Sequence, residues 1–253
     1  MLNTLANPAF FLRVSGRLLP WLGAAAAVTG AIGLYLGWTA PADYQQGETV
    51  RIMYIHVPSA WLSLFFYMIM AASALGTLVW RHPLADVSQK AAAPIGAAFT
   101  LLCLVTGSLW GKPMWGTYWV WDARLTSVLV LFLMYCGILA LWRTIEEPGR
   151  AARAVSVLTL VGAINIPIVK FSVEWWSTLH QGPSVFRLGG PTIDPSMLHP
   201  LLTMAIAFTL FGVTLHLAGM RTEILRRRVR RLALLEAERL ETGLPASFEP
   251  VLA

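Results

Sequence analysis

The chain has 253 residues, of which 57% are hydrophobic and only 13% are charged. A soluble globular domain carries about 25% charged residues, so this composition excludes an ordinary soluble protein and indicates a membrane protein. The net charge of +6 would also fit nucleic-acid binding, but the positions of the cations along the chain argue against that function. The two cysteines, Cys103 and Cys136, lie in apolar runs and do not form a disulfide framework.

Six runs contain no Asp, Glu, Lys or Arg: 18–42, 52–80, 91–111, 125–142, 154–169 and 195–220. A helix needs about 20 apolar residues to cross roughly 30 Å of hydrocarbon. The fifth run is the shortest, and Asn165 and Pro167 interrupt its end. We therefore predict an all-α membrane protein with six transmembrane helices. Its membrane domain spans residues 1–220, and a basic tail follows at 221–253.

Six spans place both termini on one side of the membrane, and the cations predict which side. If that side is cytoplasmic, fourteen of the 19 cations are inside: Arg13, Arg17, Arg81, Lys90, Arg143, Arg150, Arg153 and seven arginines after residue 220. Five are outside: Arg51, Lys112, Arg124, Lys170 and Arg187. The positive-inside rule therefore predicts cytoplasmic termini. Without the tail the count is still seven against five.

The tail sequence, "RTEILRRRVRRLALLEAERLE", predicts a basic helix that leaves the sixth span. We interpret it as a membrane-surface anchor that attracts anionic lipid. Docking to a cytoplasmic partner is the alternative.

The predicted outer segments, at about 43–57, 110–124 and 171–198, are rich in tryptophan. Seven of the eleven tryptophans lie at or beyond the outer ends of spans: Trp38, Trp110, Trp115, Trp119, Trp121, Trp175 and Trp176. An interfacial aromatic belt is one explanation, but a belt does not require a dense run within one loop. The stretch "WGKPMWGTYWVWDAR", 110–124, therefore indicates a platform on which a flat conjugated ligand stacks.

Charged residues within this stretch add to the predicted platform. Trp115, Trp119 and Trp121 are spaced so that they could share one face of an irregular loop. Lys112 and Arg124 are placed to meet carboxylates or phosphates. Asp122 is expected to pair with a neighbouring cation or to cap the fourth helix, rather than to take part in chemistry.

Three of the five histidines fall on the predicted outer side: His56, His180 and His199. His56 precedes Pro58 near the start of the second span, and His180 follows Trp175 and Trp176. His199 precedes Pro200 and is expected to be structural, whereas His82 and His216 fall on the inner side. Imidazole ligates haem iron axially, and zinc or copper sites need no aromatic platform. The pattern favours a planar, anionic, iron-bearing ring, which is haem, held by His56 and His180.

Three stretches together resemble a known family. "WGKPMWGTYWVWDARLTS" is similar to the tryptophan-rich WWD domain of the haem-handling proteins of cytochrome c maturation. "MYIHVPSAW" and "NIPIVKFSVEWWSTLHQG" narrow the match. Over roughly residues 20–220, the chain resembles the haem exporter protein C (CcmC) family.

The resemblance implies a multi-pass protein of the bacterial inner membrane, within an ABC-type complex with CcmA, CcmB and CcmD. It implies that haem b is bound at the periplasmic face and delivered to the haem chaperone CcmE. The implied axial ligands are His56 and His180. The implied platform for haem and chaperone consists of Trp110, Trp115, Trp119, Trp121 and Asp122. Arg124, Trp175 and Trp176 lie close to these residues in the sequence, so we also expect them to bind haem.

The resemblance also implies that this subunit is not an enzyme, and the sequence lacks the G-x-x-x-x-G-K-[ST] loop of ATPases. Three alternatives stay open. A haem lyase with a WWD loop is usually larger, with more spans. A b-type cytochrome would hold haems by histidine pairs at two depths, for which His82 and His216 would be needed. A permease would use the aromatic loop as a lid.

Overall fold

The computed structural model describes residues 6–182 and 184–242. The helices are Pro8–Thr39 (α2), Met53–Leu78 (α3), Ala85–Trp115 (α4), Ala123–Thr144 (α5), Pro148–Gly162 (α6), Asn165–Trp175 (α7) and Pro195–Thr242 (α8). A short 3-10 helix, Glu48–Ile52 (η1), precedes α3. Six segments are long and apolar enough to cross a membrane, with α6 and α7 together forming the fifth. No strand occurs among the described residues. The prediction of an all-α, multi-pass membrane protein with six spans is therefore confirmed.

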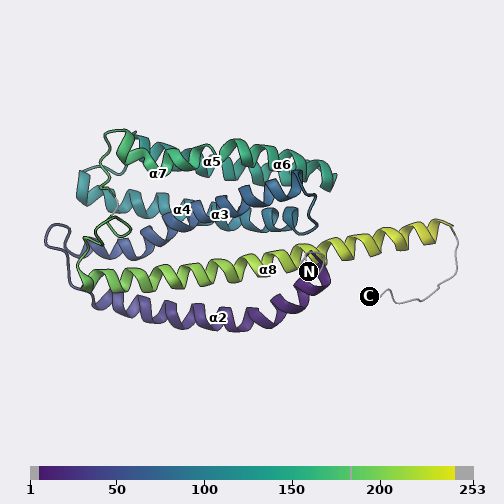
Figure 1. Cartoon of the computed structure of the whole chain (residues 1–253), viewed down its shortest axis with the longest axis horizontal. Coiled ribbons are helices and arrows are strands. Elements are labelled where there is room, and N and C mark those ends of the chain that lie inside the picture. Colours follow the sequence, from purple (N-terminus) through teal and green to yellow (C-terminus); the bar gives the residue numbers. More distant parts are fainter. Residues whose placement is uncertain (1–5, 183, 243–253) are drawn as a thin grey trace.

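The helices form a bundle in three rows (Figure 1). Helices α2 and α8 lie side by side along one edge, α3 and α4 pack together in the middle, and α5 lies with α6 and α7 at the other edge. We call the end that carries segments 40–52, 116–122 and 176–194 the aromatic end. We call the opposite end, where α2 begins and α8 leaves the bundle, the tail end. All three predicted outer segments thus meet at one end of the bundle.

Local sequence signals explain several helix boundaries. The Asn7 side chain caps α2 by accepting a hydrogen bond from the Ala9 amide at 2.8 Å, and Pro8 occupies the first helical position. Helix α4 ends at Gly116, whose φ of 75° places it in the left-handed region that favours glycine. These residues set where two of the spans begin and end.

The predicted weakness of the fifth span appears as a break between α6 and α7. Pro167 has no amide hydrogen and cannot donate to the carbonyl four residues earlier, so the helix restarts at Asn165. The Asn165 side-chain amide donates to the Ser127 carbonyl of α5 at 2.8 Å. Gly162 faces Tyr67, and a Cβ at Gly162 would lie only 2.0 Å from the Tyr67 hydroxyl oxygen. The break therefore lets α3 and α5 approach the fifth span closely.

Several buried polar residues in the middle of the bundle form hydrogen bonds with one another or with the backbone. Gln89 donates to the Thr159 hydroxyl at 3.1 Å and accepts from the Ser156 hydroxyl at 3.2 Å. The Tyr135 hydroxyl donates to the Ser63 carbonyl at 2.8 Å. A membrane interior supplies no water to such groups, so internal partners are required. These bonds link α4 to α6 and α3 to α5.

The basic tail continues α8 without a break as far as Thr242, and its last part extends beyond the other helices (Figure 1). The predicted helical tail is therefore confirmed up to that residue, and 243–253 lie outside the described residues. A helix lying on a membrane surface would need a bend where the sixth span ends, whereas α8 runs through this region as one continuous helix. The anchor interpretation stays a prediction.

Candidate functional site

His56 is the fourth residue of α3 and faces α4. Its Nδ1 lies 3.1 Å from the Cys103 carbonyl oxygen and 3.1 Å from the Thr106 hydroxyl oxygen. The Trp110 ring meets the imidazole edge-on, with the ring centroids 5.7 Å apart. A Cβ at Gly107 would lie 2.8 Å from Cε1 of His56. Helix α4 thus holds the imidazole closely from one side.

These contacts decide which ring nitrogen of His56 carries the proton. The Cys103 carbonyl can only accept a hydrogen bond, and the Thr106 hydroxyl already donates to the Leu102 carbonyl at 2.6 Å. Both neighbours of Nδ1 therefore act as acceptors, so Nδ1 is the protonated nitrogen. The lone pair is left on Nε2, which is the arrangement of a histidine prepared to ligate a metal.

His180 lies in segment 176–194, between α7 and α8. Its ring meets the Trp115 ring edge-on at a centroid distance of 5.1 Å, and its Nδ1 is buried without a hydrogen-bond partner among the described residues. Burial, and secondarily the positive charge of Arg124, lower the pKa of His180 to about 4, while Asp122 opposes the shift. The imidazole is therefore neutral at neutral pH, as a metal ligand must be.

Helix α4 brings the two predicted ligands to the same end of the bundle. Trp110 contacts His56 and Trp115 contacts His180, and these two tryptophans are one and a half turns apart on α4. The histidines are close enough that charges on both rings would repel each other. Among the described residues, no group of three or more His, Cys, Asp or Glu is placed to hold a bare metal ion. Two imidazoles suffice for haem, because the porphyrin supplies the other four ligands.

Asp122 has a structural role, as expected. One carboxylate oxygen accepts from the Leu125 amide at 2.7 Å and caps α5. The other oxygen accepts from the Leu179 amide at 3.3 Å. Since Leu179 precedes His180, this second bond ties the loop that carries the histidine to the start of α5. The sequence did not predict that tie.

The cations near the platform are already engaged within the protein. Arg124 Nη1 donates to the Val169 carbonyl and to the Ser172 hydroxyl of α7. Lys112 Nζ donates to the Gly116 carbonyl at 2.9 Å and lies over the Tyr118 ring. Their charges act on the site, but an anionic ligand would compete with these internal acceptors.

The tryptophans of the WWD stretch contact different partners and do not form one continuous stack. Trp119 and Trp121 meet edge-on at 5.4 Å, apart from the contact of Trp115 with His180. The ring nitrogen of Trp119 is buried without a hydrogen-bond partner among the described residues, whereas Trp121 is 75% exposed. Trp110 donates from Nε1 to the Gln46 side chain at 2.9 Å. The predicted tryptophans therefore include both anchored rings and a ring open to a ligand or partner.

The remaining predicted residues lie at the aromatic end with large exposed surfaces. Trp175 stacks on Phe171 at 5.4 Å and meets Trp176 edge-on at 5.7 Å. Both tryptophans are at least half exposed. His199, in α8, is also exposed. Among the described residues, neither Trp175 nor Trp176 makes a ring contact with His56 or His180.

Each of the two inner histidines has one hydrogen-bond partner. His82 Nδ1 accepts from the Leu84 amide at 3.3 Å, and His216 Nε2 lies 3.2 Å from the Ser88 hydroxyl. His82 is exposed, while His216 packs against Phe66 within the bundle. Among the described residues, no ring contact or hydrogen bond joins His82 to His216.

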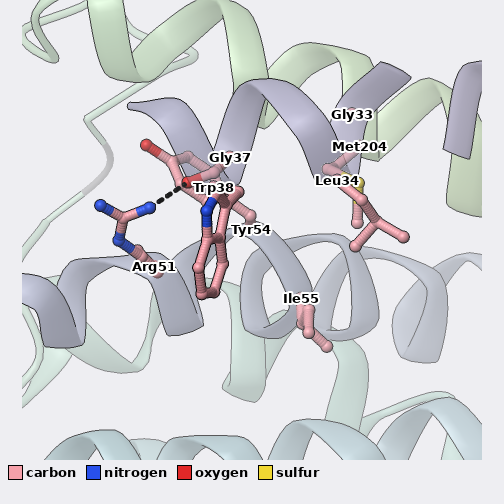
Figure 2. Close-up of a pocket in the computed structure, with 8 residues that line it drawn as sticks. All are labelled: Gly33, Leu34, Gly37, Trp38, Arg51, Tyr54, Ile55 and Met204. Atoms are coloured by element: carbon pink, nitrogen blue, oxygen red, sulfur yellow. Dashed lines mark hydrogen bonds between the residues drawn. The ribbon is translucent and has the colours of Figure 1, made fainter. Parts of the chain in front are cut away.

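A shallow pocket of about 130 Å³ lies beside the site at the aromatic end, between α2, α3 and α8 (Figure 2). Arg51 lies over the Trp38 ring and donates to the Gly37 carbonyl at 3.2 Å. Neither predicted ligand lines this pocket.

Some residues of the site were not predicted because their roles depend on contacts between distant segments. Thr106 and the Cys103 carbonyl orient His56 from positions 50 and 47 residues away. Gln46 bonds Trp110 across 64 residues. Gly107 gave no usable signal, because α4 also contains Gly96, Gly111 and six alanines, so the close approach of His56 to Gly107 could be seen only in the structure.

Comparison with known proteins covers almost the whole chain, including the residues of the site. The family model described as Heme exporter protein C (CcmC) matches residues 1–235. The Heme exporter protein C of Bradyrhizobium diazoefficiens is 68% identical over 236 residues, covering 93% of this chain and 90% of that protein. That of Escherichia coli K12 is 48% identical over 231 residues, covering 91% and 93%. A putative cytochrome c biosynthesis ccmC-like mitochondrial protein of Marchantia polymorpha is 49% identical over 211 residues, covering 83% and 90%. The chain therefore belongs to the Heme exporter protein C family.

Proposed function

We propose that this chain binds haem b as cargo between His56 and His180 and delivers it to the chaperone CcmE during cytochrome c maturation. The observation that carries the proposal is the meeting of both imidazoles with α4, each against a tryptophan of that helix. The relatives named Heme exporter protein C support haem as the cargo.

The two histidines have different mechanical support, which suits binding followed by release. His56 is held by the α3 backbone and by its contacts with α4, and it offers Nε2 to the iron. His180 is held by a loop, whose tie to α5 is the 3.3 Å bond from Leu179 to Asp122. Movement of this loop removes one axial ligand and leaves the other in place. We propose that His180 leaves first when haem passes to the chaperone.

The proposal includes the surroundings of the protein. The chain lies in the bacterial inner membrane with its aromatic end in the periplasm, beside CcmA, CcmB and CcmD. It acts as a haem-handling subunit and not as an enzyme. Exposed Trp121, Trp175 and Trp176 offer rings to haem or to CcmE from the periplasmic side.

The central test is to purify the chain with and without CcmE and to record visible spectra. We expect substoichiometric haem that moves to CcmE when the chaperone is added. Stoichiometric haem that stays bound and is reversibly reduced would instead indicate a b-type cytochrome and would contradict the proposal.

Orientation needs a separate test at Thr117, in the segment between α4 and α5. A cysteine at this position should react with a membrane-impermeant thiol reagent added from the periplasmic side. Labelling from the cytoplasmic side alone would reverse the proposed topology and place the histidines on the wrong face.

A further inference from the structure

A cavity of about 280 Å³ opens at the tail end, where the start of α2, the start of α4 and the basic part of α8 come together. Pro83, Val87 and Ile224 give it apolar walls, and Arg227, Arg228 and Arg231 line it as well. It lies at the opposite end of the bundle from His56 and His180. Haem binding therefore does not explain it.

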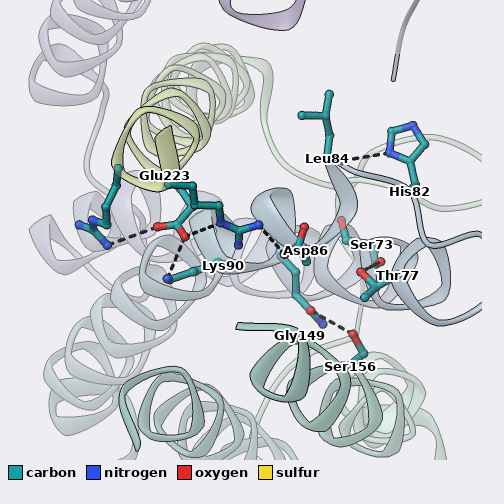
Figure 3. Close-up of polar contacts among 12 residues, drawn as sticks. Ser73, Thr77, His82, Leu84, Asp86, Lys90, Gly149, Ser156 and Glu223 are labelled. Atoms are coloured by element: carbon teal, nitrogen blue, oxygen red, sulfur yellow. Dashed lines mark hydrogen bonds and ion pairs between the residues drawn. The ribbon is translucent and has the colours of Figure 1, made fainter. Parts of the chain in front are cut away.

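Arg227 is held firmly by acidic residues. It donates to Asp86 at 2.6 Å and to Glu223 at 2.9 Å, and Lys90 donates to the same oxygen of Glu223 at 2.9 Å. Figure 3 shows how Glu223, Asp86 and Lys90 converge. The second terminal nitrogen of Arg227, Nη2, is buried without a partner among the described residues. An unsatisfied buried donor is costly, and a nearby anion would reduce that cost.

Arg228 and Arg231 have no such compensation. Both are exposed, and neither forms an ion pair with another described residue. The cavity therefore has two uncompensated positive charges at its rim, in addition to the balanced charge of Arg227.

The start of α2 adds a third source of positive potential. Asn7 and Pro8 line the cavity, and the first turn of α2 contains no acidic residue that would offset the helix dipole. Pro8 has no amide hydrogen and the Ala9 amide already donates to Asn7, so this contribution comes from the positive end of the helix dipole, which favours anions, in combination with the guanidinium groups of Arg228 and Arg231.

We infer that this cavity binds the phosphate of an anionic phospholipid, with the first carbons of the lipid against Pro83, Val87 and Ile224. A free phosphate would use only the arginines and would leave the apolar wall without a partner. The location supports a lipid, since the residues that line the cavity lie just outside the uncharged runs that are long enough to cross a membrane. Basic pockets between helices at a membrane surface are suited to anionic headgroups. This site is independent of the proposed haem function.

The test uses the full chain purified in detergent and titrated with dioleoylphosphatidylglycerol, dioleoylphosphatidylcholine or inorganic phosphate. Native mass spectrometry counts the lipid molecules retained. We expect the chain to retain phosphatidylglycerol at concentrations at least about tenfold lower than phosphatidylcholine. Inorganic phosphate should displace it only weakly.

The variant Arg228→Gln/Arg231→Gln should weaken phosphatidylglycerol binding by roughly tenfold or more, because two charge-assisted hydrogen bonds are lost. Both residues are exposed, so the variant should fold. Arg153→Gln/Arg230→Gln is the matched control: it removes two exposed charges at the same end from residues that do not line the cavity.

Three results would overturn the inference. Equal retention of both lipids would exclude selectivity for an anionic headgroup. Equal losses in the two double variants would indicate diffuse attraction to a basic surface instead of a site. Strong competition by inorganic phosphate would assign the cavity to a free anion and not to a lipid.

Discussion

The two ends of the bundle treat their charged residues differently. At the tail end, the nearly buried carboxylate of Glu223 is surrounded by Lys90, Arg226 and Arg227, all within ion-pair distance. Around the two histidines, Arg124 and Lys112 instead donate to backbone carbonyls. The carboxylate of Glu223 thus has its counter-charges inside the protein, whereas neither Arg124 nor Lys112 forms an ion pair with another described residue.

This difference separates a stabilising ion-pair cluster at the tail end from the predicted haem ligands at the aromatic end. The Glu223 cluster links α8 to α4 and has a full set of partners for its carboxylate. Around the histidines, His180 Nδ1 and Trp119 Nε1 are buried donors or acceptors without partners among the described residues. Such groups also occur elsewhere, for example Nη2 of Arg227 at the tail end, so they do not by themselves mark the haem site. Because the Glu223 cluster and the two histidines lie at opposite ends of the bundle, we expect variants at the two ends to have separable effects.

The largest expected effect is the loss of a ligand. His56→Ala and His180→Ala should each lower haem affinity at least 10- to 100-fold, since even the loss of a supporting partner of a metal ligand costs that much. His82→Ala, His199→Ala and His216→Ala should retain haem. Visible spectra of the five purified variants measure the effect. Full haem with an unchanged spectrum in either of the first two would remove that residue from the site.

Removal of the ring faces should have the next largest effect. Replacing Trp115, Trp119 and Trp121 together with Leu keeps the chain apolar, and haem delivery to CcmE should fall roughly tenfold or more, because each ring contact contributes measurably. Trp21→Leu/Trp80→Leu is the control, since both rings are exposed away from the site. Wild-type delivery by the triple variant would mean that the loop is only an interfacial belt.

A smaller change at the aromatic end tests the support of His56. Gly107→Ala would place a Cβ 2.8 Å from Cε1 of His56, so the imidazole must move away from Cys103 and Thr106. We expect roughly tenfold weaker haem binding with the fold retained. Gly23→Ala is the matched helix control, because its Cβ would meet only Thr214 Cγ2 at 3.9 Å. Equal haem spectra in both variants would show that the orientation of His56 is unimportant.

At the tail end we expect a loss of stability with haem binding unchanged. Glu223→Gln leaves Lys90 and Arg227 with a weaker acceptor, and the free energy of unfolding should fall by about 1 kcal/mol, a value discounted because both cations are partly exposed. Thermal unfolding in detergent measures the loss, and the haem spectrum should not change. Glu236→Gln, which removes an exposed pair with Arg239, should have less effect. A changed haem spectrum in Glu223→Gln would mean that the two ends are coupled.

The smallest expected effect is that of pH on haem retention. The pKa of His180 is about 4, so its ring stays neutral and able to bind iron from about pH 8 down to about pH 5. The free energy of unfolding depends on pH differently. The histidine of the unfolded chain takes up a proton near pH 6.5, whereas folded His180 does so only near pH 4. The folded state should therefore lose stability as the pH falls from about 6.5 towards 4. Half-loss of haem near pH 6.5 would show that His180 titrates as an ordinary exposed histidine.

Local chemistry made much of the fold predictable. The six spans follow from uncharged runs of sufficient length, because a bilayer imposes that length on any helix that crosses it. Asp122 was expected as a possible cap, and the break near Pro167 was visible as a weak span. Each of these features depends on residues within a few positions of one another.

The contacts that organise the site depend on distant residues. Aromatic density and outer placement were enough to select His56, His180 and the tryptophans around them, although their role in haem binding stays a prediction. The sequence could not predict which tryptophan of α4 contacts which histidine. That pairing depends on how α3 and the loop before α8 pack against α4.

The sequence by itself determined the number of spans, the end at which the aromatic residues gather and several helix boundaries, since hydrophobic length, proline and capping act locally. Only the tertiary structure decided that Thr106 and Cys103 leave Nε2 of His56 free, and that Glu223 joins Lys90 across 133 residues. Those pairings depend on the rotation and depth of one helix against another. Many different side chains are compatible with the same hydrophobic pattern, so the pattern does not specify that alignment.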